Sequence, residues 1–142
     1  MDKPVIELDT YRITNISYSS FETQEELEQF QDEDGSVSVT VGVTEDDKNA
    51  RISISTTVLK SDEEQFDFKK MTMEVTGYFT INVEDNIQEY LNVNATAIMF
   101  PYLRTFISVI TSLDNSKAIV IPTINTNRFR NNGQTKSHTE WL

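Results

Sequence analysis

The chain has 142 residues and carries 12 basic against 23 acidic side chains, a formal net charge of -11. This length fits one domain, and the acidic balance argues against nucleic acid or an anionic membrane surface as a partner. The absence of cysteine excludes disulfides, thiol chemistry and thiolate zinc sites. The N-terminus shows no basic region followed by an apolar one, and no apolar run approaches the roughly 20 residues of a membrane span. We therefore expect a cytoplasmic protein that does not insert into a membrane.

The N-terminal stretch predicts a first strand with an irregularity. Tyr11 and Ile13 alternate in one phase, whereas Ile16 and Tyr18 alternate in the other. Successive side chains of a strand point to opposite faces, so a shift of one residue changes the buried face. A bulge near Asn15 would bring the two pairs back to one face.

A crossover arm follows. Thr23 and Glu26 have the spacing of a helix capping box, and Leu27 and Phe30 share one side of the short helical turn that it begins. An arm that carries apolar groups outward from a sheet has little core to reach. We therefore hypothesise that these two side chains, together with Phe21, line an exposed groove.

A hairpin is predicted next. Valine occupies every second position of residues 37–43, and the positions between are serine, threonine and glycine, which is typical of a half-buried strand. Turn-forming residues at 45–49 lead into a second alternating run over 52–58. Two such runs joined by a short polar turn predict an antiparallel hairpin.

A longer alternating run covers residues 71–83 and predicts a fourth strand. Phe66 and Phe68 lie in the opposite phase, so we expect either a bulge or a change of face at Lys69–Lys70.

The second half of the chain predicts helix. Ile87, Tyr90 and Leu91 indicate a short helical turn, and a longer helix follows. Its apolar residues recur with the 3.6-residue period that covers a sheet: Tyr102, Leu103, Phe106, Ile107, Ile110 and Leu113. Pro101 belongs in the first turn of that helix or else kinks it. The expected fold class is α+β, a four-stranded antiparallel sheet with a long C-terminal helix and short helices packed on one face.

Sites for catalysis, metals and nucleotides find no support in the sequence. His138 is the single histidine and lies in a polar tail, where no fixed partner is expected for a catalytic base. Asp32 and Asp34 lack the closing glutamate of a calcium loop, and the acidic run 45–47 is interpreted as a hairpin tip. With four glycines and no Gly-rich phosphate loop, nucleotide binding is not expected. We predict no enzyme activity and no cofactor.

A resemblance to a known family rests on two ordered motifs near the C-terminus. The first is Phe100-Pro101-Tyr102 with Arg104, and the second places Pro122, Asn125 and Phe129 in the following segment. In this order the motifs resemble those of the bacterial export chaperone family SecB, and the four-strand layout upstream agrees with that family. The resemblance covers Ile6 to Phe129. It implies a SecB-like chaperone domain over 1–129 and a polar, disordered tail over 130–142.

The resemblance implies function as well as fold. SecB-like proteins hold unfolded or partly folded polypeptides in apolar grooves without ATP, and they assemble as homotetramers, dimers of dimers joined through sheet edges and the long helix. The implied client-binding groove consists of Phe21, Leu27, Phe30, Tyr102, Ile124 and Phe129. The implied oligomer interface consists of Phe106, Ile107 and Ile110.

One departure from the family pattern concerns export. The family's first strand carries Asp-Ile-Ser-Phe-Glu, whose acids help dock the export motor SecA, whereas Asn15 and Ser19 stand at those positions here. Glu74 resembles a later motor-facing glutamate, but Thr72 replaces a leucine beside it. Export targeting is therefore weakly supported. The alternatives are a dedicated chaperone of one client such as an antitoxin, or a non-chaperone acidic interaction scaffold.

Overall fold

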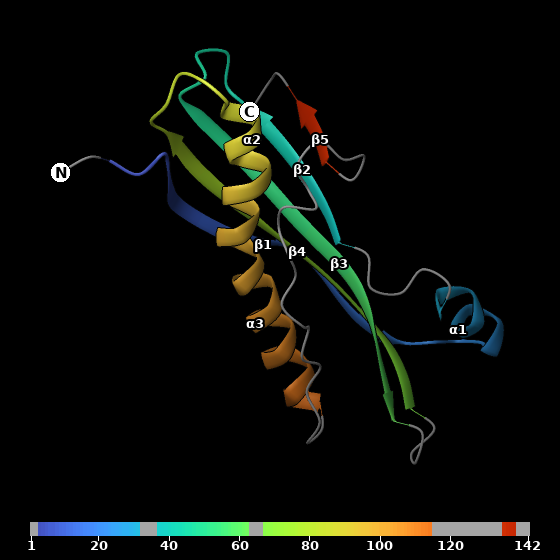
Figure 1. Ribbon diagram of the computed structural model, residues 1–142. Coiled ribbons are helices and arrows are strands. Elements are labelled where there is room, and N and C mark those ends of the chain that lie inside the picture. Colours follow the sequence, from blue (N-terminus) through green and yellow to red (C-terminus); the bar gives the residue numbers. More distant parts are fainter. Residues whose placement is uncertain (1–2, 32–36, 63–66, 115–134, 139–142) are drawn as a thin grey trace.

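The computed structural model describes the backbone of residues 3–31, 37–62, 67–114 and 135–138, and the side chains of 3–30, 37–60 and 68–114 (Figure 1). The elements follow one another along the chain in this order: β1 (Ile6–Ser20), α1 (Gln24–Gln31), β2 (Val37–Val43), β3 (Asn49–Asp62), β4 (Asp67–Ile81), α2 (Ile87–Tyr90), the π-helical turn η1 (Leu91–Ala95), α3 (Thr96–Asp114) and β5 (Thr135–His138).

One twisted sheet and one long helix build the protein. The strand order is β1-β4-β3-β2-β5; β1 to β4 pair antiparallel, and β5 is parallel to β2. Figure 1 shows α3 lying along one face of the sheet, with α1 beyond the end of β1. The predicted α+β fold, four antiparallel strands with a long C-terminal helix on one face, is confirmed. The short helix α1 stands away from that face.

The predicted hairpin is β2 and β3, in which Val43 pairs with Ala50 next to the turn. At its tip the Asp46 carboxylate accepts hydrogen bonds from the Thr44 hydroxyl at 2.7 Å and the Lys48 backbone N–H at 3.1 Å. These two donors hold the pKa of Asp46 below its usual value. The carboxylate thus stabilises the turn through local hydrogen bonds.

Two irregularities in β1 keep its apolar residues on one face. The register against β4 shifts between Leu8 and Thr10 and again between Ile13 and Asn15. The pairs that result are Ile6 with Ile81, Leu8 with Phe79, Tyr11 with Gly77, Ile13 with Val75, Ile16 with Met73 and Tyr18 with Met71. All these β4 partners are odd-numbered and therefore share a face. The bulge predicted near Asn15 is confirmed, and the first one was missed, although the phase of Ile6 and Leu8 signals it.

Of the two alternatives expected at Lys69–Lys70, a bulge or a change of face, the bulge is wrong. Pairing between β3 and β4 runs from Asn49 to Asp62 without a shift, and β1 also pairs with both lysines in regular register. Because the alternation is uninterrupted, Phe68 lies on the face opposite Met71. Phe66 is outside the described residues.

The core lies between the sheet and the helix. Along the helix, every fourth residue is fully buried: Leu91, Ala95, Met99, Leu103, Ile107 and Thr111. Beneath it, Gly77 of β4 lets α3 approach closely, since a methyl group at Gly77 would overlap the sulfur of Met99. Glycine here creates room for the helix rather than flexibility.

The helical turn predicted at residues 87–91 is confirmed, and it continues through η1 into α3 as one helix, Ile87–Asp114. Pro101 lies inside α3, so of the two alternatives expected for it, a place in the first turn is wrong and a kink stays a prediction. Proline cannot donate a hydrogen bond to the carbonyl of the residue four positions earlier. The π-helical turn η1 lies just upstream, and the buried stripe continues through it from Leu91 to Ala95.

This 28-residue helix is long and apolar enough to cross a membrane by length and composition, with a mean hydropathy of 1.3 in its best window. The sequence expectation counted unbroken apolar runs, which polar residues such as Asn94 and Arg104 interrupt, and so missed it. A core helix of a soluble protein passes the same test, and the fully buried stripe of this helix packs on the sheet. Length and composition therefore do not assign the helix to a membrane.

The polar tail contains a short strand. Thr135–His138 forms β5 beside β2, so this part of the predicted disordered tail, 130–142, is a strand; the rest of the tail lies outside the described residues. The physical reason is that the backbone of an edge strand offers unpaired N–H and C=O groups to any extended segment, polar or not.

Candidate functional site

The arm α1 is held by a cap at its start. The Thr23 hydroxyl accepts a hydrogen bond from the Glu26 backbone N–H at 3.1 Å, as the capping box predicted. The Glu26 carboxylate reaches back one residue further than expected and accepts from the Glu22 N–H at 3.2 Å. These bonds fix the direction in which α1 leaves the end of β1.

A hollow of about 260 Å³ opens on this arm, lined by Phe21, Glu26, Gln29, Phe30 and Lys70. The rings of Phe21 and Phe30 lie 5.5 Å apart between centroids, tilted by 56°. The Lys70 ammonium sits 5.9 Å from the centre of the Phe21 ring, within cation–π range. We call this site the arm hollow. It offers two aromatic rings, one cation and one carboxylate to a ligand.

Leu27 behaves differently from its neighbours. It is 5% exposed and does not line the arm hollow, so it supports the arm from within. Phe21 and Phe30, which the sequence grouped in one predicted groove, lie together in this hollow, whereas the sequence did not indicate Lys70. That residue is distant in sequence, and only the pairing of β1 with β4 carries it to the arm.

Tyr102 belongs to a second site. Its ring lies 4.4 Å from that of Tyr11 and 6.4 Å from that of Phe106, and Tyr11 and Phe106 are 6.0 Å apart. Tyr11 is 41% exposed. This aromatic cluster joins the edge strand β1 to α3. Sequence reasoning missed Tyr11 because only the tertiary fold pairs β1 with the helix.

The predicted interface residues fall in different environments. Phe106 and Ile110 are half-buried, whereas Ile107 is fully buried in the core of its own chain. Val109 at 50% and Leu113 at 78% exposure are the more accessible apolar side chains of α3. Of these two, Leu113 belongs to the apolar stripe that the sequence predicted, whereas Val109 does not.

The remaining predicted groove residues, Ile124 and Phe129, lie outside the described residues, as do Asp32 and Asp34 of the calcium-loop comparison. Among the residues that the structure describes, no group of three His, Asp or Glu side chains could hold a metal ion.

Glu74 lies on the face of the sheet opposite α3. The Thr14 hydroxyl donates to its carboxylate at 2.6 Å. Neighbouring hydroxyls continue the network, with Thr14 and Thr76 3.0 Å apart and Thr76 and Ser53 2.8 Å apart. Around Glu74 this face is therefore a band of hydroxyl groups, one of which holds the Glu74 carboxylate.

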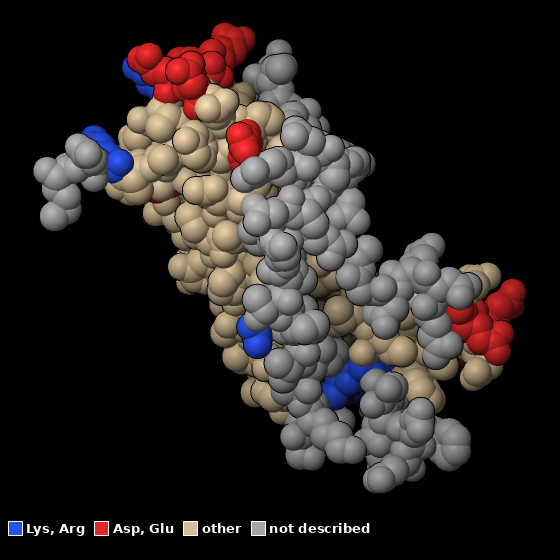
Figure 2. All heavy atoms as spheres, in the orientation of Figure 1, with Lys and Arg blue, Asp and Glu red and all other residues tan. Residues whose placement is uncertain are grey.

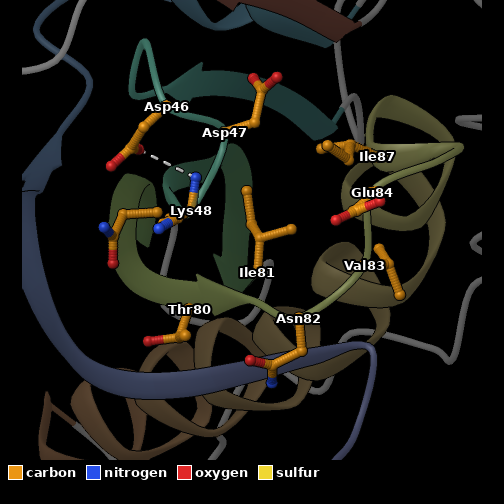
Figure 3. Close-up of a pocket in the computed structure, with 10 residues that line it drawn as sticks. Asp46, Asp47, Lys48, Thr80, Ile81, Asn82, Val83, Glu84 and Ile87 are labelled. Carbon is orange, nitrogen blue, oxygen red and sulfur yellow. Dashed lines mark hydrogen bonds between the residues drawn. The ribbon is translucent and has the colours of Figure 1, made fainter.

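A larger hollow of about 640 Å³ lies at the end of the sheet near the β2–β3 turn (Figure 3). Asp46, Asp47 and Lys48 reach it from that turn, and Glu84 comes from the segment after β4, on the other side. The acidic run is the hairpin tip that the sequence predicted. Figure 2 shows acidic residues gathered over this end of the molecule and again over α1.

A sheet of four antiparallel strands under one long helix, with aromatic side chains at its arm and edge, defines a SecB-like α+β protein. The family model described as preprotein translocase subunit SecB matches residues 2–136. The chain belongs to the SecB family, and this membership supports a chaperone role.

Two solved structures share this fold. The solved structure of the Mycobacterium tuberculosis SecB-like chaperone Rv1957, in complex with a ChAD peptide from the HigA1 antitoxin, superposes with a TM-score of 0.63 at 11% identity, over 84% of this chain and 90% of that one. A Streptococcus agalactiae protein of unknown function gives a TM-score of 0.56 at 12% identity, over 83% of this chain and 97% of that one.

A sequence relative comes from an archaeon. An uncharacterized protein of Methanocaldococcus jannaschii is 37% identical over 68 residues, which is 44% of this chain and 44% of that protein. The matched region thus spans less than half of the relative's length.

Proposed function

We propose that this protein is an ATP-independent holdase chaperone that binds unfolded or partly folded polypeptides. The observation that carries the proposal is the arm hollow, where Phe21 and Phe30 stand 5.5 Å apart beside Lys70. An extended polypeptide loses chain entropy when it binds, so apolar contacts along it must offset that loss. Membership of the SecB family supports the same role.

We propose a client-binding surface in two parts. The arm hollow takes aromatic or aliphatic client residues, and the cluster of Tyr11, Tyr102 and Phe106 offers a second apolar surface beside α3. Ile124 and Phe129 complete the proposed groove. Leu27 is retained only as a support, because its 5% exposure leaves little surface for a client.

The assembly proposed is a homotetramer, a dimer of dimers. Two features support it. The edge strand β1 carries Ile13 and Ile16, each 45% exposed, and α3 carries the exposed Val109 and Leu113. Isolated monomers seldom leave a long edge strand and an apolar helix face uncovered. We propose a cytoplasmic location and no direct insertion into a membrane.

A second candidate function is a dedicated chaperone of one client such as an antitoxin. The M. tuberculosis neighbour bound to an antitoxin peptide favours it. A role in protein export, with docking of the motor SecA, has weaker support, because Asn15 and Ser19 stand where the family has acids and the Glu74 carboxylate already accepts a hydrogen bond from Thr14. The third candidate, an acidic scaffold, predicts no accessible apolar groove for an environment-sensitive dye.

The decisive experiment measures aggregation of several unrelated unfolded proteins with and without this chain, in the absence of ATP. We expect suppression by the parent and a clear loss in the double variant Phe21→Ser with Phe30→Ser. The matched control, Phe21→Leu with Phe30→Leu, keeps apolar surface and should retain most of the capture. Equal capture by the serine and leucine variants would remove the arm hollow from the proposed site.

Capture of one client and no other would favour the dedicated chaperone. Absence of any capture, with no dye binding, would favour the acidic scaffold.

A further inference from the structure

The outer edge of β2 is filled by a remote segment of the same chain. Residues 135–138, which form β5, pair in parallel with residues 39–42 of β2, whereas all other strand pairs among the described residues are antiparallel. The segment returns to the sheet from beyond Asp114, where α3 ends. A parallel ladder is slightly less stable per residue than an antiparallel one, and this one is short, from Val39 with Thr135 to Gly42 with His138. This edge is therefore covered by a small, separately arriving strand.

Two rows of paired residues cross the sheet and end at β5. The first row is Ile13, Val75, Ile54, Val39 and then Thr135. The second row is Tyr11, Gly77, Ile52, Val41 and then Ser137. In each row the four antiparallel members are apolar residues or glycine, and the fifth is a hydroxyl residue. Val39 is 1% and Val41 0% exposed, so each row is still in the core where it reaches β2, next to its last member.

The row between them is polar throughout. Thr40 of β2 pairs with Ser53 of β3 and with Lys136 of β5, and Ser53 pairs with Thr76. A strand added to this edge thus meets apolar and polar rows in alternation. Pairs on one face of a sheet are stabilised when neighbouring residues are both apolar.

We propose that the β2 edge is a strand-addition site for an extended polypeptide segment with apolar residues at alternate positions, and that residues 135–138 are its built-in, displaceable occupant. The proposal rests on the proposed function and adds the chemistry of the partner. An incoming segment forms the same backbone ladder as β5. If apolar residues of that segment lie opposite Val39 and Val41, they extend the two apolar rows and bury apolar surface. Thr135 and Ser137, which occupy these positions in β5, do not.

The built-in occupant makes the site selective. Because it is tethered, β5 competes at a high effective concentration, so only a segment with better side-chain contacts displaces it. It also blocks unspecific edge-to-edge association while no client is present. An alternating apolar segment exposed by an unfolded chain satisfies the condition, whereas a polar loop does not.

The first test opens the site. Lys136→Pro with Ser137→Pro removes two backbone donors of β5 and keeps the chain at full length. The probe is a soluble synthetic peptide with valine at alternate central positions and lysines at both ends. We expect the proline variant to bind it about tenfold more tightly than the parent. This factor corresponds to a parent in which β5 leaves the site vacant in about one molecule in ten. The same peptide with N-methylated central amides keeps the side chains and charge and should lose this gain.

The second test closes the site. The parent has no cysteine, so Thr40→Cys with Lys136→Cys gives a single disulfide between register partners. We expect the oxidised form to bind the peptide at least about tenfold more weakly than its reduced form, and each single-cysteine variant to respond to neither oxidant nor reductant.

Equal binding by the oxidised and reduced forms, or by the plain and N-methylated peptides, would overturn the proposal. If the parent still suppresses aggregation and locking does not change this, the proposed chaperone function stands and the β2 site falls. If the parent captures no unfolded protein, both fall. If the proline variant doubles in mass without binding the peptide, the edge takes a second copy of the chain, which also overturns the peptide occupant.

Discussion

Tyr11 of the edge strand β1 lies against Tyr102 of α3, with 4.4 Å between the ring centroids. This contact joins the edge of the sheet to the apolar face of the helix. No pattern in the sequence links these two surfaces. Aromatic pairs at such distances add stabilisation beyond their buried area. Since Tyr11 keeps 41% of its surface exposed, the pair is also available to a partner.

The first prediction concerns assembly. Val109→Asp and Leu113→Asp should lower the native mass measured by light scattering, because they place a charge on exposed positions of α3. Their monomers should unfold within about 0.5 kcal/mol of the parent, as expected for surface changes. Ile107→Asp is the contrasting variant and should prevent folding, because that side chain is fully buried. A parent that is monomeric across micromolar concentrations would contradict the tetramer.

The second prediction concerns the close packing of β4 and α3. Gly77→Ala should destabilise the fold by about 1–3 kcal/mol, since the new methyl group overlaps the Met99 sulfur. Denaturant unfolding of Gly77→Ala, Met99→Ala and the double variant gives the test. The double variant should be more stable than the sum of the single effects, because the smaller side chain makes room. Strict additivity would show that the two residues do not compete for space.

The third prediction compares two buried threonines of α3. Among the described residues the buried Thr96 hydroxyl has no hydrogen-bond partner, whereas the Thr111 hydroxyl donates to the Ile107 carbonyl at 2.7 Å. Thr96→Val should therefore be neutral or stabilise by up to about 1 kcal/mol, and the matched Thr111→Val should cost about 1 kcal/mol. Thermal or denaturant unfolding distinguishes them. An equal loss in both variants would show that the Thr96 hydroxyl has a partner.

The fourth prediction concerns acid. The Asp114 carboxylate accepts hydrogen bonds from Lys69 at 2.6 Å and from Tyr18 at 2.8 Å, and these bonds lower its pKa from 3.8. A carboxylate with a lowered folded-state pKa stabilises above its unfolded-state pKa and loses that contribution as the pH falls through the folded-state value. The stability difference between the parent and Asp114→Asn should therefore be constant near neutral pH and vanish in strong acid. A difference that persists there would mean that the side chain acts without its charge.

The fifth prediction concerns the export motor. Asn15→Asp with Ser19→Glu should strengthen binding to SecA, and the gain should shrink as salt is added. Exposed charge pairs contribute roughly 0.2–1 kcal/mol each. The two substitutions meet different charges across the strands, since Asn15 pairs with Glu74 and Ser19 pairs with Lys70. Like charges across strands are unfavourable, so Asn15→Asp alone should lower monomer stability more than Ser19→Glu alone. Tight, salt-insensitive binding by the parent would move the docking face to another surface.

The sequence by itself determined the elements that depend on local periodicity. A strand has a period of two, so the alternating valines of 37–43 and the polar turn after them predict a hairpin by themselves. The change of phase around Asn15 predicts a bulge, because a bulge returns the apolar side chains to one face. The capping box at Thr23 is equally local. The ordered motifs around Phe100 and Pro122 were enough to indicate the family, and its fold follows.

Only the tertiary structure decided which distant residues meet. The Lys70 ammonium joins Phe21 and the Tyr11 ring joins Tyr102 because strand pairing and helix packing bring these residues together, and no local pattern records such contacts. Leu27 and Ile107 are buried because other parts of the fold cover them. Their apolar character alone does not say whether they are buried or exposed. The addition of β5 to β2 was equally hidden. An edge strand pairs through its backbone, so a polar segment takes that place without leaving a side-chain signal in the sequence.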